Sequence, residues 1–87
     1  MPGVSRVNQD TAGGTIIGIL APTVFVNGKP IAVKGANVEP HGSGPHGSPK
    51  MQDHSGTVFA NGIEICRAGD TATCGHPATG SDNVFAD

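Results

Sequence analysis

The stretch of sequence that decides the fold occurs twice. Residues 21–35 read APTVFVNGKPIAVKG, and residues 55–69 repeat the pattern as SGTVFANGIEICRAG. Both copies share Thr-Val-Phe, then Asn-Gly, then an Ile and a closing Gly. Asn-Gly between two runs of β-forming residues indicates a hairpin, because both residues tolerate the positive φ of a type I′ turn. We therefore predict β-hairpins over residues 22–34 and 56–68.

The two ends of the chain predict a third copy. Residues 81–87 (SDNVFAD) resemble the outgoing strand, and residues 3–10 (GVSRVNQD) resemble the return strand with the Asp that follows it. We expect the copies at about 21–36 and 55–70 and the paired ends to form three hairpins around an approximate three-fold axis. The prediction is one all-β domain over residues 1–87, with the termini side by side on the face that carries both Asn-Gly turns.

The composition agrees with short strands rather than helices. The 87 residues include 14 Gly and 7 Pro, no Trp or Tyr, and three Phe. Gly and Pro disfavour helix interiors, and a chain of this size buries little apolar surface. Disorder is the alternative reading, against which the small net charge and the matched apolar segments argue. We expect a metal, a disulfide or a partner to supply the missing stability.

Charge and hydropathy argue against several classes of function. Five Lys and Arg against seven Asp and Glu give a formal net charge of −2, and no basic patch with interleaved aromatics suits nucleic acid. The longest apolar stretch, residues 16–21, is far shorter than the roughly 20 residues that span a bilayer. Residues 1–6 lack the layout of a signal peptide, so we expect synthesis in the cytoplasm, with Cys66 and Cys74 as thiols or metal ligands.

Two close pairs of metal-binding residues stand far apart in the sequence. His41 and His46 lie in a loop rich in Gly and Pro, and Cys74 and His76 follow the second hairpin. Paired ligands on distant segments are the general layout of a tetrahedral zinc site, and four protein ligands leave no open position for catalysis. The pattern predicts a structural zinc site, with solvated loop histidines as the alternative. We expect His54 at the surface or beside the site.

The chain resembles the PAAR-repeat proteins, the sharpened tips of contractile injection machines, over nearly its whole length. The family hallmark is a Pro-Ala-Ala-Arg stretch, preceded by an Asn-Gly turn and followed by Gly-Asp. Residues 27–32 (NGKPIA) match its first part, and the second copy keeps Arg67, Gly69 and Asp70. The HGSGPH and CGH segments look like those of the short phage-type members. Many members have a His soon after the N-terminal Asp, where residues 11–14 here read TAGG.

The resemblance implies a small cone of three β-hairpins with a metal ion near its apex. Three His and one Cys hold a zinc ion in the family, and the matching residues here are His41, His46, Cys74 and His76. His54 is the reserve ligand, and iron is the alternative metal. The base of the cone is implied to dock on the blunt end of a trimeric β-helical spike, with one copy per trimer.

The function implied by the resemblance is structural and not enzymatic. The protein would be the piercing tip of a contractile phage tail or a type VI secretion device, incorporated in the particle or ejected with it. It would touch the target membrane only transiently. We expect the contacts with the spike at the two turns, Asn27 with Gly28 and Asn61 with Gly62.

Two other functions compete with this interpretation. The first is an adaptor that carries a toxin cargo on the spike, for which no motif is expected. The second is a small zinc hydrolase, which would need an open metal position and a nearby base such as Glu39 or Asp70.

Overall fold

Both Asn-Gly turns fold as the sequence predicts. The two antiparallel hairpins comprise β3 (Phe25–Val26) with β4 (Lys29–Pro30), and β5 (Phe59–Ala60) with β6 (Ile63–Glu64). The φ angles are 52° at Asn27 and 82° at Gly28, and 51° at Asn61 and 81° at Gly62. Positive φ at both central positions defines the type I′ turn, which confirms this prediction.

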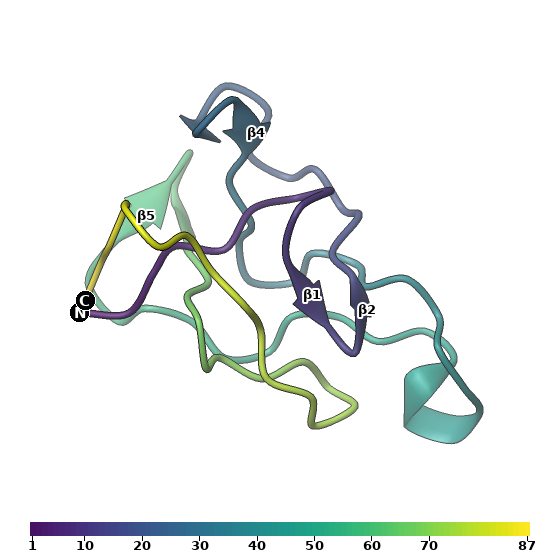
Figure 1. The fold of residues 1–87 in the computed structure, drawn as a ribbon. Helices are drawn as coiled ribbons and strands as arrows, with labels where there is room; N and C mark the ends of the chain where they lie inside the picture. Colours follow the sequence, from purple (N-terminus) through teal and green to yellow (C-terminus); the bar gives the residue numbers. More distant parts are fainter.

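The two ends of the chain pair with each other in the computed structural model, which describes all of residues 1–87. Gly3 bridges Phe85 in antiparallel fashion, and the amide of Val4 donates to the carbonyl oxygen of Val84 at 2.9 Å. The N- and C-termini therefore lie side by side at one end of the molecule (Figure 1). The bridge is equivalent to the Phe25–Pro30 and Phe59–Glu64 pairs, and the two chain ends stand where the other hairpins have their turns.

A closed ring of three backbone hydrogen bonds joins the return strands. The amide of Ala32 donates to Ser5, that of Cys66 to Ala32 and that of Ser5 to Cys66, at 3.0, 2.9 and 3.0 Å. The three residues occupy equivalent positions in their copies, and all are fully buried. Three isolated bridges repeat the same cyclic order: Val4 with Arg67, Arg6 with Ile31, and Val33 with Ile65. One chain thus acquires approximate three-fold symmetry, and each return strand has two neighbours.

The left-handed residue that follows each return strand repeats in all three copies. The φ angles are 86° at Gly35, 93° at Gly69 and 62° at Asn8. Asn is the residue other than Gly that visits this region most readily, so the N-terminal copy keeps the backbone path without a Gly. The equivalence of these residues extends the symmetry beyond the hydrogen-bonded ring.

A further hairpin and a short helical turn lie outside the repeat. β1 (Thr11–Ala12) pairs with β2 (Gly14–Thr15) across Gly13, whose φ is 87°. The Gly- and Pro-rich loop contains the 3₁₀ helix η1 (Gly44–His46), where we expected no helix; Pro45 stands in its first turn and its fixed φ suits that position. The structure has no helix long and apolar enough to cross a membrane.

The core is divided between the two ends of the molecule, which measures 32 × 23 × 22 Å. One apolar cluster lies among the three hairpins and comprises Val4, Ala21, Val26, Ile31, Val33, Ala60, Ile65 and Ala86. The other comprises Val7, Ala12, Ile16, Ala32, Ala36, Val38, Met51, Cys66, Ala72 and Ala78, with Cys74 packed against it. The side chains are small, so each cluster buries modest apolar area and additional stabilisation from a metal or partner is physically reasonable.

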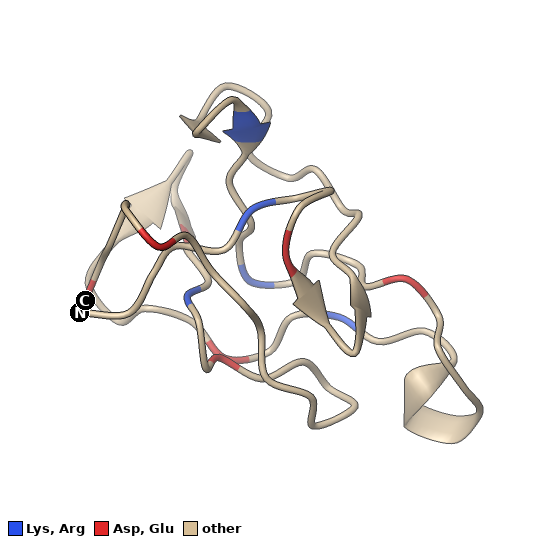
Figure 2. Ribbon diagram, viewed as in Figure 1, with Lys and Arg blue, Asp and Glu red and all other residues tan.

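Two buried carboxylates each accept hydrogen bonds from an arginine on a return strand. Asp10 accepts hydrogen bonds from the amide and the guanidinium of Arg6, and Asp70 does the same for Arg67, with distances of 2.8 to 3.2 Å. These bonds raise the pKa of each arginine. The remaining charges are dispersed around the molecule without a cluster of Lys and Arg (Figure 2).

Candidate metal centre

Two loops bring four metal-binding side chains together at the end of the molecule opposite the termini (Figure 1). His41, His46, Cys74 and His76 each place one donor atom so that all four atoms lie within 4.8 Å of one another. The first loop closes because the amide of His41 donates to the carbonyl oxygen of His46 at 2.9 Å. The second closes between Ala72 and His76 at 3.0 Å. The curvature of these loops turns both pairs toward one point.

The spacing of the donor atoms fits a four-coordinate ion. His41 Nε2 lies 3.0 Å from His76 Nδ1 and 3.1 Å from His46 Nδ1, and Cys74 Sγ lies 3.5 Å from both His41 Nε2 and His76 Nδ1. Tetrahedral zinc with its usual Zn–N and Zn–S bond lengths would separate such atoms by about 3.3 to 3.6 Å. Three imidazoles and one thiolate are also a donor set that zinc accepts.

A backbone carbonyl fixes the orientation of one ligand. Nδ1 of His41 lies 3.0 Å from the carbonyl oxygen of Glu39. A carbonyl oxygen only accepts, so Nδ1 carries the proton and Nε2 presents its lone pair toward the other three donors. Glu39, which sequence analysis considered as a catalytic base, thus contributes its main chain to the centre.

Gly13 lies directly against the donor atoms, and sequence analysis did not identify it. A Cβ added at this position would stand 2.3 Å from His76 Nδ1 and 2.6 Å from His41 Nε2. Gly13 also adopts a φ that favours Gly, at the turn between β1 and β2. The Gly-Gly pair in TAGG is the sequence signal that could have pointed to a close approach here.

Two other candidate residues lie outside the donor group. His54, the reserve ligand, places Nδ1 2.8 Å from the carbonyl oxygen of Ser55 and 3.9 Å from a carboxylate oxygen of Glu64. Cys66 is fully buried, and burial raises the pKa of its thiol to about 12. Cys66 therefore stays protonated at neutral pH and acts as a small apolar side chain.

The arrangement favours a structural ion over a catalytic one. Four protein donors converge, which is typical of a closed structural site. Asp70, the other candidate base, is engaged by the amide and guanidinium of Arg67. Neither feature suits the hydrolase alternative, which requires an open metal position and a free base.

The expected spike contacts lie at the opposite end, where the hairpin tips are linked to their neighbours. Asn27, Gly28, Asn61 and Gly62 are all exposed. The side-chain amide of Asn27 donates to Asn83 at 2.7 Å, and that of Asn61 donates to Thr23 at 3.1 Å. Asn83 and Thr23 are equivalent positions of different copies. The two asparagines therefore link the first copy to the third and the second copy to the first, as well as forming the turns.

All three aromatic residues of the chain are exposed at equivalent positions. Phe25, Phe59 and Phe85 have exposed fractions of 57%, 55% and 50%. Each precedes a buried residue on its strand, since side chains alternate between the two faces. Sequence analysis used these residues only to align the copies. The sequence signal for a binding role was that all three phenylalanines of the chain, which has no Trp or Tyr, stand at the same position of the three copies.

Comparison with known proteins identifies one family. The PAAR motif family model matches residues 8–80, a segment that contains all four donor residues and both Asn-Gly hairpins. None of the curated proteins compared with the chain matches it.

Proposed function

Because this chain belongs to the PAAR motif family, we propose that it is the tip that caps the trimeric β-helical spike of a contractile injection device. The family is associated with such spike tips and is structural rather than enzymatic. The observation that carries the proposal is the three-fold repeat of an exposed phenylalanine at the end opposite the metal centre. The device is a contractile phage tail or a type VI secretion apparatus.

A single chain can match a trimer only if it presents three similar surfaces, because each subunit of the spike offers the same contact. The hydrogen-bonded ring through Ser5, Ala32 and Cys66 supports this geometry. Exposed aromatic side chains favour burial in an interface, where large apolar groups contribute most of the binding energy. We therefore assign the contact with the spike to the surface around Phe25 and Phe59 and the matching terminal position, with one chain per trimer.

The metal centre supports a mechanical role at the other end. We propose a zinc ion held by His41, His46, Cys74 and His76, because the nitrogen and sulfur donors suit it. The ion would join two loops, residues 41–47 and 73–77, that contribute no buried residue to either apolar cluster, and it would stiffen the end that meets the target envelope. The protein would act there by shape and rigidity during a brief contact with the membrane, after synthesis in the cytoplasm and assembly onto the particle.

A binding experiment tests this function. The purified chain is titrated with the trimeric spike protein of its own system, beside a variant with Phe25→Ser, Phe59→Ser and Phe85→Ser. We expect the variant to remain folded and to bind at least about 100-fold more weakly, since anchor residues of an interface each contribute about 2 kcal/mol. Ile19→Ser, another exposed apolar position, is the control with unchanged binding. Equal binding by the triple variant would contradict the proposal.

A further inference from the structure

One lateral face of the molecule is apolar, whereas the equivalent faces are not. Ile17, Ile19 and Leu20 expose 42%, 48% and 45% of their surface. Ile19 and Leu20 directly precede the first repeat, residues 21–35. Asp53 and His54 stand at the same place before the second repeat, residues 55–69. An apolar face that occurs once cannot serve three identical spike subunits, so its partner differs from the one proposed above.

The amides of Ile17 and Gly18 donate to the carbonyl oxygen of Asn37, but the rest of the main chain of this face is unpartnered. The amides of Ile19 and Leu20 donate no hydrogen bond, and no carbonyl oxygen from Ile17 to Leu20 accepts one within the chain. In the second copy the amide of Asp53 donates to the carbonyl oxygen of Thr71 at 3.0 Å, and the carbonyl oxygen of His54 accepts from Arg67 at 3.2 Å. Free amide and carbonyl groups beside apolar side chains are what a polypeptide segment can pair with.

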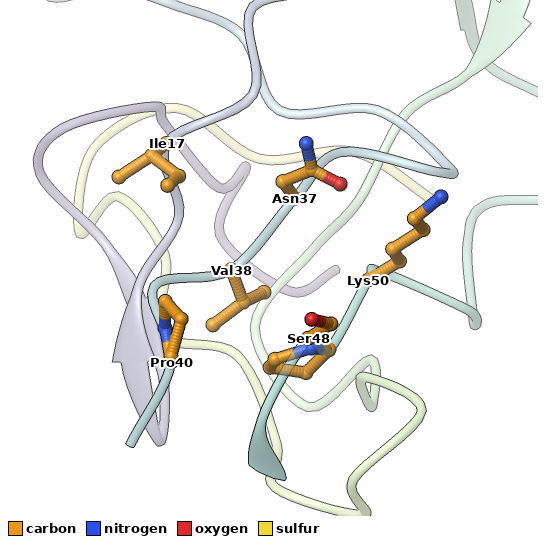
Figure 3. A pocket seen from close by; sticks show the side chains of 7 residues that line it. Ile17, Asn37, Val38, Pro40, Ser48 and Lys50 are labelled. Carbon is orange, nitrogen blue, oxygen red and sulfur yellow. The ribbon is translucent and has the colours of Figure 1, made fainter. Parts of the chain in front are cut away.

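A pocket of about 470 Å³ adjoins this segment at Ile17. Ile17 and Pro40 lie on one side of it and Lys50 lies across from them, with Val38 between (Figure 3). The remaining lining residues are Asn37, Ser48 and Pro49. The pocket thus has apolar side chains at one end and a cationic side chain at the other.

The pocket is lined by one cation that has no ion-pair partner, and the carboxylate of Glu39, between Val38 and Pro40, is not among the lining groups. Lys50 is the charged residue among those that line the pocket, and no carboxylate oxygen lies within 4.0 Å of its amino group. Lys34 is likewise unpaired and precedes Gly35, where an added Cβ would lie 3.8 Å from Leu20. An occupant that carries a carboxylate beside its apolar side chains would complement both features.

We propose that the segment Ile17–Leu20 and the adjoining pocket form a docking site for a peptide segment of a partner protein that combines apolar side chains with acidic ones. An apolar side chain occupies the pocket beside Ile17 and Pro40, and a carboxylate pairs with Lys50. Backbone groups of the peptide pair with those of Ile19 and Leu20. The site takes one partner per chain, and hence one per tip, because the other two faces lack it.

The test uses the metal-loaded full chain without any spike, so its outcome is independent of the spike proposal. The probe is a synthetic capped peptide of sequence Val-Asp-Val-Ile-Asp-Val, and the readout is the shift of backbone amide resonances in a ¹⁵N-labelled sample. We expect shifts at Ile17, Asn37 and Lys50. A peptide with Lys in place of each Asp is the charge control and should cause none.

Two single substitutions separate the apolar contribution from the charged one. Lys50→Gln should weaken binding by about fivefold, the effect of losing one exposed ion pair, and Ile17→Ser should weaken it at least as much. Phe59→Ser, on another face, should leave binding unchanged. All three variants change exposed side chains, so their amide spectra report whether the fold is retained.

Other occupants of this face are distinct outcomes that would overturn the proposal. If the peptide causes no shifts but vesicles of phosphatidylcholine and phosphatidylglycerol bind in an Ile19-dependent way, the face contacts lipid. If sedimentation shows a dimer that Leu20→Ser dissolves, the face belongs to a second copy. Peptide shifts confined to residues around Phe25, Phe59 and Phe85 would place the acidic segment elsewhere.

Discussion

The backbone amide of Ala32 donates to the carbonyl oxygen of Ser5 at 3.0 Å, and this bond joins the return strand of the first hairpin to the N-terminal strand. Ser5 in turn donates to Cys66, whose amide returns to Ala32, so that removing any member opens the ring. The side chain of Ser5 adds a hydrogen bond to the carbonyl oxygen of Thr79 at 2.7 Å. The three copies are therefore held as one unit by buried main-chain contacts between them.

Breaking the ring at Ser5 should destabilise the whole fold. Ser5→Pro removes the amide donor and leaves the carbonyl oxygen of Cys66 without its partner, at a cost of about 3 kcal/mol or more in the free energy of unfolding. Chemical denaturation monitored by circular dichroism measures the loss. Asn8→Gly is the matched control, because Gly already occupies the equivalent left-handed positions 35 and 69; we expect no loss of stability there. An unchanged midpoint for Ser5→Pro would contradict the ring.

Removing Asp70 alone should destabilise the protein more than replacing Arg67 and Asp70 together. Asp70→Ala leaves the amide and guanidinium of Arg67 without their acceptor, and we expect a loss of about 2 to 4 kcal/mol. The double variant Arg67→Val, Asp70→Ala copies residues 33 and 36 of the first hairpin, which are Val and Ala. It should regain about half of that loss, since the guanidinium is removed together with its acceptor and only the main-chain amide of residue 67 stays without one. A double variant less stable than Asp70→Ala would refute this explanation.

The reactivity of Cys74 should measure metal binding, and the reactivity of Cys66 should measure unfolding. In the metal-loaded protein neither Cys66 nor Cys74 should react with an aromatic disulfide reagent at neutral pH. A chelator should release Cys74 alone, because Cys66 is fully buried and burial raises its pKa to about 12. Both should react in denaturant. Rapid reaction of Cys74 in the loaded protein would argue against its role as a ligand.

A side chain at position 13 should weaken metal binding as well as strain the turn between β1 and β2. Gly13→Ala places a Cβ within 2.3 Å of His76 Nδ1, so we expect the metal content of the purified protein to fall and the chelator to remove the remainder faster. Gly69→Ala is the matched control, because its φ of 93° is equally unfavourable for Ala but no atom lies within 4 Å of the added Cβ. Both variants should lose about 1 kcal/mol from backbone strain. Only Gly13→Ala should lose metal.

The parts of the fold that sequence could predict are those whose signals are local and repeated. Asn27-Gly28 and Asn61-Gly62 specify their turns through their own φ preferences. Residues 81–87 and 3–10 resemble the two strands of the repeat, which indicates a third copy and hence the symmetry. The hairpin β1–β2 escaped prediction because Thr11 to Thr15 has no partner in the repeat. Its formation depends on the tight turn at Gly13, which the metal loops surround.

The composition of the metal centre was easier to predict than its geometry. His and Cys in close pairs identify candidate ligands by chemistry, whereas the choice of Nε2 at His41 depends on the carbonyl of Glu39, a contact that spacing does not reveal. The close approach of Gly13 and the exposure of Phe59 are likewise tertiary properties, since each depends on segments distant in the sequence.

The most direct test of the account is the stoichiometry of the complex between this chain and a trimeric spike. Native mass spectrometry of the two purified proteins, mixed with the chain in excess, should show a single complex heavier than the spike trimer by one chain of 8.7 kDa. That result follows from three similar faces on one chain. A complex that carries three chains per trimer, or a spike that stays free at every ratio, would contradict it.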